Sequence, residues 1–76
     1  PCAWFVTSGG KKLKVMECRA VVSQGEAPGT VLATKPLTVA CADGGIQLLQ
    51  VVPEGKKPMD GTSFAAGLRL KTGDVL

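Results

Sequence analysis

The stretch that decides the fold is residues 43–59, which read DGGIQLLQVVPEGKKPM. A glycine-rich turn opens it, an apolar run follows at residues 46–52, and a lysine pair between two prolines closes it. Side chains alternate between the two faces of a strand, so this run places apolar residues on both: Ile46, Leu48 and Val52 on one, Leu49 and Val51 on the other. We therefore predict a central strand covered on both sides, which delivers Lys56 and Lys57 to the rim of a small barrel.

Length and composition allow one small folded domain. The chain has 76 residues, of which 45% are hydrophobic and 20% charged, as in globular domains. No apolar run approaches the roughly 18 residues of a membrane span, and no signal peptide is visible. The first residue is Pro1, so we expect a fragment or a cleaved product. The net charge of +3 favours an anionic partner only weakly, because solvated lysine is common on protein surfaces.

The cysteine and histidine counts argue against a metal site and against catalysis. Cys2, Cys18 and Cys41 form no CxxC motif and no disulfide framework, and the chain contains no histidine. Nucleophilic arrangements of the Ser-His-Asp or Cys-His kind are therefore excluded, and no two acidic residues are spaced for acid/base work. We expect no catalytic residue and no cofactor or metal site. Cys18 and Cys41 are predicted to be buried, which fits a reducing, intracellular compartment.

Strand and turn patterns fill most of the chain. We expect strands at residues 3–7, 12–22, 30–34, 37–42, 46–52 and 68–71. The turns between them are expected at Ser8-Gly9-Gly10-Lys11, Pro28-Gly29, Lys35-Pro36 and Asp43-Gly44-Gly45. In the second strand the apolar positions change face near Met16, which predicts a bulge or sharp bend of the kind that closes small barrels. The predicted fold is mainly β: a small OB-like barrel of five to six strands with one short helix.

The helix is predicted over residues 61–66. Asp60 is a suitable N-cap, and Gly67 is expected to end the helix in the left-handed conformation. Gly61 is expected to weaken the first turn by up to ~1 kcal/mol relative to alanine. Because a helix of this length does not persist alone, Phe64 is expected to dock it on the barrel.

The basic residues fall into three groups that a barrel could bring together. They are Lys11, Lys12 and Lys14 near the first hairpin, Lys56 and Lys57 after the central strand, and Arg69 and Lys71 on the expected last strand. If they converge, they form a patch suited to a phosphate backbone; if they scatter, they are ordinary surface charges. Aromatic residues are few, so binding would position a nucleic acid rather than read its sequence.

Several short motifs, taken in order, carry a family resemblance. They are Ala3-Trp4, Ala27-Pro28-Gly29-Thr30, Asp43-Gly44, Gly55-Lys56-Lys57-Pro58-Met59, Gly67 with Arg69-Leu70, and Gly73-Asp74-Val75-Leu76. With this order and spacing the chain resembles the C-terminal domain of the methionyl-tRNA formyltransferase family. The resemblance covers essentially the whole chain.

This resemblance implies a cytoplasmic enzyme with a Rossmann-like catalytic domain outside this chain. That domain would bind the formyl donor, 10-formyltetrahydrofolate, so this chain alone should transfer no formyl group. Residues 1–4 would end the interdomain linker, and residues 5–76 would form a barrel that contacts initiator tRNA. Lys56 and Lys57 match the lysine pair of the family and are the first candidates for that contact.

Two other interpretations remain open at this point. The first is a structural domain that packs on a catalytic domain, as the resemblance to formyltransferases of nucleotide sugars implies; the doubly apolar central strand is consistent with it. The second is an OB-type binder of single strands, which needs exposed aromatic side chains. The candidates for that role are Trp4, Phe5 and Phe64, and for Trp4 a place as a core or rim anchor is the simpler expectation.

Overall fold

The computed structural model describes residues 3–7 and 9–76 of the chain. Pro1, Cys2 and Ser8 lie outside the described residues, as do the side chains of Ala3 and Trp4. The expectations for Cys2, for the indole of Trp4 and for residues 1–4 as the end of a linker therefore stay predictions.

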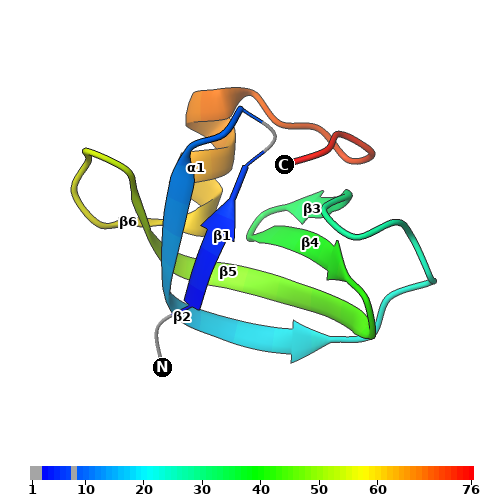
Figure 1. The fold of residues 1–76 in the computed structure, drawn as a ribbon. Helices are drawn as coiled ribbons and strands as arrows, with labels where there is room; N and C mark the ends of the chain where they lie inside the picture. Colours follow the sequence, from blue (N-terminus) through cyan, green and yellow to red (C-terminus); the bar gives the residue numbers. More distant parts are fainter. Residues whose placement is uncertain (1–2, 8) are drawn as a thin grey trace.

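One antiparallel sheet with a short helix makes up the fold (Figure 1). The elements are β1 (Ala3–Val6), β2 (Lys12–Val21), β3 (Val31–Thr34), β4 (Leu37–Cys41), β5 (Gly44–Pro53), β6 (Met59–Asp60) and α1 (Gly61–Leu68). The sheet order is β1-β2-β5-β4-β3, and β6 pairs with β5. The sheet curls into a half-barrel, and α1 packs against its strands β5, β4 and β3. The predicted mainly β, barrel-like fold with one short helix is confirmed.

Two opposed bulges bend the long strands β2 and β5. Val15 lies opposite Val51 and Cys18 lies opposite Leu48, so each strand contains an irregularity between these pairs. The extra residues are Met16 in β2 and Leu49 in β5, because Glu17 lies opposite Gln50. The predicted bend near Met16 is confirmed. The prediction that Leu48 and Val51 lie on opposite faces was wrong: the bulge at Leu49 lies between them, and both side chains belong to the same core cluster.

The core lies between the concave face of the sheet and α1. It is formed by Leu13, Val15, Val31, Leu37, Val39, Leu48, Val51, Phe64, Ala65 and Leu76. Residues 16–20 of β2, beyond the bulge, are exposed, including Met16 at 42% and Cys18. The prediction that Cys18 is buried was therefore wrong, and Cys41 is only half-buried. The error has a plain cause: β1 pairs with β2 only as far as Val15, and no described element packs over the strand beyond it.

The start of α1 agrees with the sequence prediction. Asp60 is the N-cap, and its Oδ1 accepts a hydrogen bond of 2.7 Å from the backbone N–H of Ser63. This hydrogen bond holds the pKa of the Asp60 carboxyl below its ordinary value. Gly61 has a different role from the one expected, because a Cβ there would overlap the carbonyl oxygen of Leu48. A glycine at the first position thus lets the helix approach β5 closely.

The end of α1 differs from the prediction. Gly67 lies inside the helix, which continues to Leu68, and Arg69 adopts the left-handed conformation with φ of 54°. The backbone N–H of Arg69 donates a hydrogen bond of 3.1 Å to the carbonyl of Ala66, and the N–H of Leu70 donates one of 3.0 Å to the carbonyl of Ala65. These bonds satisfy the last carbonyls of the helix, at the cost of a conformation that residues with a side chain rarely adopt.

Replacing Arg69 by glycine is expected to stabilise the domain by about 0.5–1 kcal/mol, because glycine adopts the left-handed conformation without steric cost. Urea unfolding measures the change. Arg69→Ala is the matched control, since it removes the same charge and keeps the Cβ. If the glycine and alanine variants are equally stable, the conformation at residue 69 costs nothing.

The C-terminal segment forms no closing strand at residues 68–71, contrary to the prediction. Arg69 turns the chain away from the sheet, and residues 73–76 run instead along the outer edge of β3. Val31 donates its N–H to the Asp74 carbonyl at 2.7 Å, and Leu76 donates to Gly29 at 2.9 Å. Leu76 is buried in the core, so this segment covers the edge that a sixth long strand would otherwise occupy.

Candidate nucleic-acid interface

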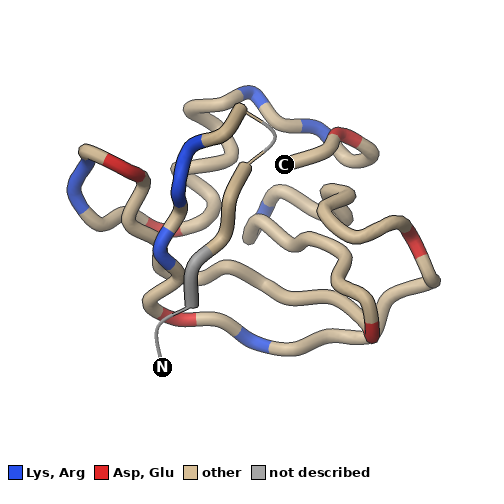
Figure 2. The backbone as a smooth tube through the Cα atoms, in the orientation of Figure 1, with Lys and Arg blue, Asp and Glu red and all other residues tan. Residues whose placement is uncertain are grey.

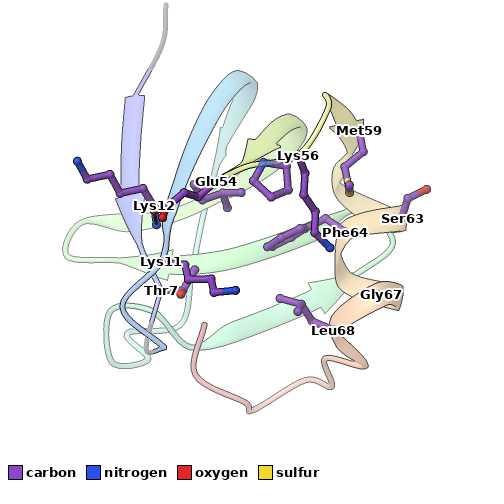
Figure 3. Close-up of a pocket in the computed structure, with 12 residues that line it drawn as sticks. Thr7, Lys11, Lys12, Glu54, Lys56, Met59, Ser63, Phe64, Gly67 and Leu68 are labelled. Carbon is purple, nitrogen blue, oxygen red and sulfur yellow. Dashed lines mark hydrogen bonds between the residues drawn. The ribbon is translucent and has the colours of Figure 1, made fainter.

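A pocket of about 400 Å³ lies between the β1–β2 hairpin, the β5–β6 loop and α1 (Figure 3). Its walls are apolar and come from Leu13, Pro53, Met59, Phe64 and Leu68. Lys11, Lys12 and Lys56 lie at its rim, together with Thr7, Glu54, Ser63 and Gly67. In Figure 3 the side chains of Lys11 and Lys56 extend toward the space above Phe64 and Leu68, whereas Lys12 points away from it.

The two segments that carry these lysines are fixed by backbone hydrogen bonds. Two backbone hydrogen bonds of 2.9 Å close the hairpin turn. The N–H of Thr7 donates to the carbonyl of Lys11, and the N–H of Gly10 donates to the carbonyl of Thr7. The β5–β6 loop turns at Gly55, where φ is +75°, and Lys56 N–H bonds the Pro53 carbonyl at 2.9 Å. The positions of Lys11 and Lys56 are therefore set by turns, not by long flexible loops.

A pair of hydrogen bonds joins the two segments to each other. Glu54 N–H donates to the Lys12 carbonyl at 3.0 Å, and Lys12 N–H donates to Oε1 of Glu54 at 3.0 Å. The Glu54 carboxylate is thus held against the backbone of β2. Hydrogen bonds to a carboxylate are the stronger kind, so the loop and the hairpin keep a fixed spacing.

A second hollow lies on the other side of the same loop. It is lined by Lys12, Lys14, Val52, Pro53, Glu54, Gly55 and Lys56. Lys12 and Lys56 are shared with the first pocket, so four cations from two distant parts of the sequence surround one loop. Figure 2 shows the basic segments of β2 and of the β5–β6 loop on the same side of the molecule.

The other three predicted cations flank this cluster. Lys57 is exposed beside Lys56 but lines neither hollow. Arg69 and Lys71 are exposed and follow Leu68, which lines the first pocket. In Figure 2 the basic segments that follow α1 lie at the same end of the molecule as the hairpin tip. Arg19 in β2 and Lys35 in the β3–β4 turn are exposed and line neither hollow.

Sequence reasoning missed the apolar walls of the first pocket. Phe64 and Leu68 are four residues apart on α1, a spacing that places them on one helix face, and this signal was available. Pro53 and Leu13 meet across the β2–β5 pairing, which no local pattern shows. Phe64 is only 8% exposed and Phe5 is half-buried, so among the described side chains no open aromatic platform is present.

Among the described residues no group of three or more His, Cys, Asp or Glu side chains could hold a metal ion. No helix in the described ranges is long and apolar enough to cross a membrane. The chemistry that the site offers is a set of ammonium groups beside an apolar pocket, which suits an anion that also carries an apolar body.

Comparison with known proteins identifies the family. Residues 1–69 match the formyl transferase C-terminal domain family, and the chain belongs to it. Methionyl-tRNA formyltransferase of Jannaschia sp. (strain CCS1) is 43% identical over 76 residues, covering 100% of this chain and 24% of that protein. The enzyme of the same name from Myxococcus xanthus (strain DK1622) is 46% identical over 71 residues, covering 91% of this chain and 22% of that protein. The enzyme of Solibacter usitatus (strain Ellin6076) is 41% identical over 71 residues, covering 92% of this chain and 23% of that protein.

The chain thus spans about a quarter of the length of the curated relatives it matches. The resemblance predicted from the sequence motifs is confirmed: this chain corresponds to the C-terminal domain of methionyl-tRNA formyltransferases.

Proposed function

We propose that this chain is the tRNA-docking domain of a cytoplasmic methionyl-tRNA formyltransferase. A catalytic domain outside this chain would bind 10-formyltetrahydrofolate and transfer its formyl group to the amino group of methionine on initiator tRNA. Residues 1–4 would be the end of the linker to that domain. The observation that carries the proposal is the cluster of Lys11, Lys12, Lys14 and Lys56 around one loop, in a family whose relatives are named for a tRNA substrate.

The mechanism is electrostatic docking. Lysine ammonium groups are compact point charges that suit phosphate oxygens, and neutralising phosphates releases counterions from the RNA. With ~3 to 4 phosphates contacted, the binding constant should fall by about the third power of the salt concentration. Contacts far from the reacting atoms help catalysis by holding the substrate in place, so this domain would supply orientation and no chemistry of its own.

The double variant Lys56→Ala/Lys57→Ala is expected to bind tRNA about tenfold more weakly at low salt. It should also show a salt slope smaller by about two, because two phosphate contacts are lost. A tRNA titration at two or more salt concentrations measures both quantities. Arg19→Ala/Lys35→Ala is the matched control, since it removes two cations that lie outside the cluster. Binding by the Lys56/Lys57 variant equal to that of the unmodified chain would refute the role given to the pair.

A second candidate function is a structural domain that packs on a formyltransferase catalytic domain. The part of β2 beyond the bulge favours it, because Met16, Cys18 and Ala20 are all exposed there. Adding the catalytic part of a relative in trans separates the two functions. Association that is unaffected by tRNA, and that is lost when Met16 is replaced by glutamate, would favour the structural role.

A further inference from the structure

The pocket between the hairpin, the β5–β6 loop and α1 differs from the flat basic surface that duplex docking alone requires. Phosphates of a duplex need exposed cations and no cavity. Here a pocket of about 400 Å³ adjoins the cations, and its walls are side chains such as Leu13, Pro53, Phe64 and Leu68. Its volume falls in the range of sites that hold a small organic group.

The chemistry of the pocket matches a single unpaired nucleotide. A base that has left the stack exposes two apolar faces, and proteins hold such a base between aromatic and apolar side chains. Its phosphates remain outside, within reach of cations. Lys11 and Lys56 come from opposite walls and extend toward the mouth of the pocket, above Phe64 and Leu68 (Figure 3).

We propose that this pocket binds one unpaired nucleotide of an RNA strand, with the base against Phe64 and Leu68 and the flanking phosphates beside Lys11 and Lys56. This inference rests on the proposed function and makes it more specific: the domain would favour RNA with an unpaired base next to a duplex. The two hydrogen bonds between Lys12 and Glu54, one of them to the Glu54 carboxylate, fix the hairpin wall to the loop wall, so the pocket is formed before the ligand arrives.

Gly67 gives a way to fill the pocket without disturbing the core. It lines the pocket, it is exposed, and a Cβ there would have no heavy atom within 4 Å. It also lies inside α1, where any ordinary side chain fits the backbone. Gly67→Phe should therefore occupy the pocket, and Gly67→Ala is the matched control because it changes the same backbone position but adds only a methyl group.

The test compares three RNA probes on the 76-residue chain: a blunt duplex, the same duplex with an unpaired overhang, and the duplex with an abasic overhang of equal length. The abasic probe has the same number of phosphates, so it separates base binding from charge. The overhang with bases is expected to bind about tenfold more tightly than either other probe. Gly67→Phe should abolish this preference, whereas Gly67→Ala should keep it.

Equal affinity for the two overhangs would overturn the pocket assignment, and so would a preference that survives in Gly67→Phe. In either case salt-dependent binding of the blunt duplex would still support the proposed docking function. If the unmodified chain bound neither tRNA nor any of the three probes, both the pocket assignment and the proposed docking function would be overturned. A fluorescent adenine analogue in the overhang adds a direct readout: its emission should change with the unmodified chain and not with Gly67→Phe.

Discussion

Replacing Phe64 by alanine is expected to lower the free energy of unfolding by about 3–5 kcal/mol. Phe64 is 8% exposed and belongs to the core cluster that joins α1 to β5 and β4. A helix of eight residues has too few hydrogen bonds to persist alone, so α1 depends on this contact. A domain of this size has a total stability of only ~4 to 11 kcal/mol, and the variant should be largely unfolded in moderate urea.

Urea unfolding followed by circular dichroism measures the change. Leu68→Ala is the matched control on the same helix, because Leu68 is 52% exposed and should cost less than about 1 kcal/mol. Phe64→Leu should recover much of the loss, since it refills most of the cavity. A loss of less than about 1 kcal/mol for Phe64→Ala would mean that α1 does not depend on this side chain.

The parts of the fold that local chemistry specifies were predictable from the sequence. Asp60 accepts from an N–H three residues ahead, so its role as N-cap needs no knowledge of the fold. The glycine turns and the strands between them follow from backbone preferences of single residues. The bend at Met16 was also visible, because a change of apolar face within one strand has few other causes.

The errors fall where distant parts of the chain decide the outcome. Gly67 and Arg69 are both possible helix ends, and the packing of Leu70 and Leu76 on the core favours the end at Arg69 in spite of its conformational cost. The alternating pattern of residues 68–71 is that of a strand, but the edge of β3 is occupied by residues 73–76. Cys18 follows an apolar pattern on a face that no described element covers.

The candidate site was predictable as a set of cations but not as a cavity. Lys11 and Lys56 are each visible as charges beside a turn. Their placement on one pocket depends on the pairing of Leu13 with Pro53 and on the hydrogen bonds between Lys12 and Glu54. Both are contacts between residues about 40 apart in sequence, and no local propensity encodes them.

Charge reversal at the two lysines of the pocket mouth is expected to have the largest effect on RNA binding. Lys11→Glu/Lys56→Glu should weaken binding of tRNA on the order of 100-fold at low salt, because it removes two attractions to phosphates and adds two repulsions. The difference from the unmodified chain should shrink as salt is raised, since exposed charges are screened over about 10 Å at 0.1 M salt.

The matched control is Arg19→Glu/Lys35→Glu, which changes the net charge by the same amount at exposed positions outside the cluster. If the field of the whole domain attracted the RNA, the two double variants would bind equally weakly. If the hairpin and the β5–β6 loop form the contact surface, the control should lose only a few-fold, mainly in the association rate. Stopped-flow and equilibrium titrations with the same tRNA separate these cases, because a lost contact raises the dissociation rate as well.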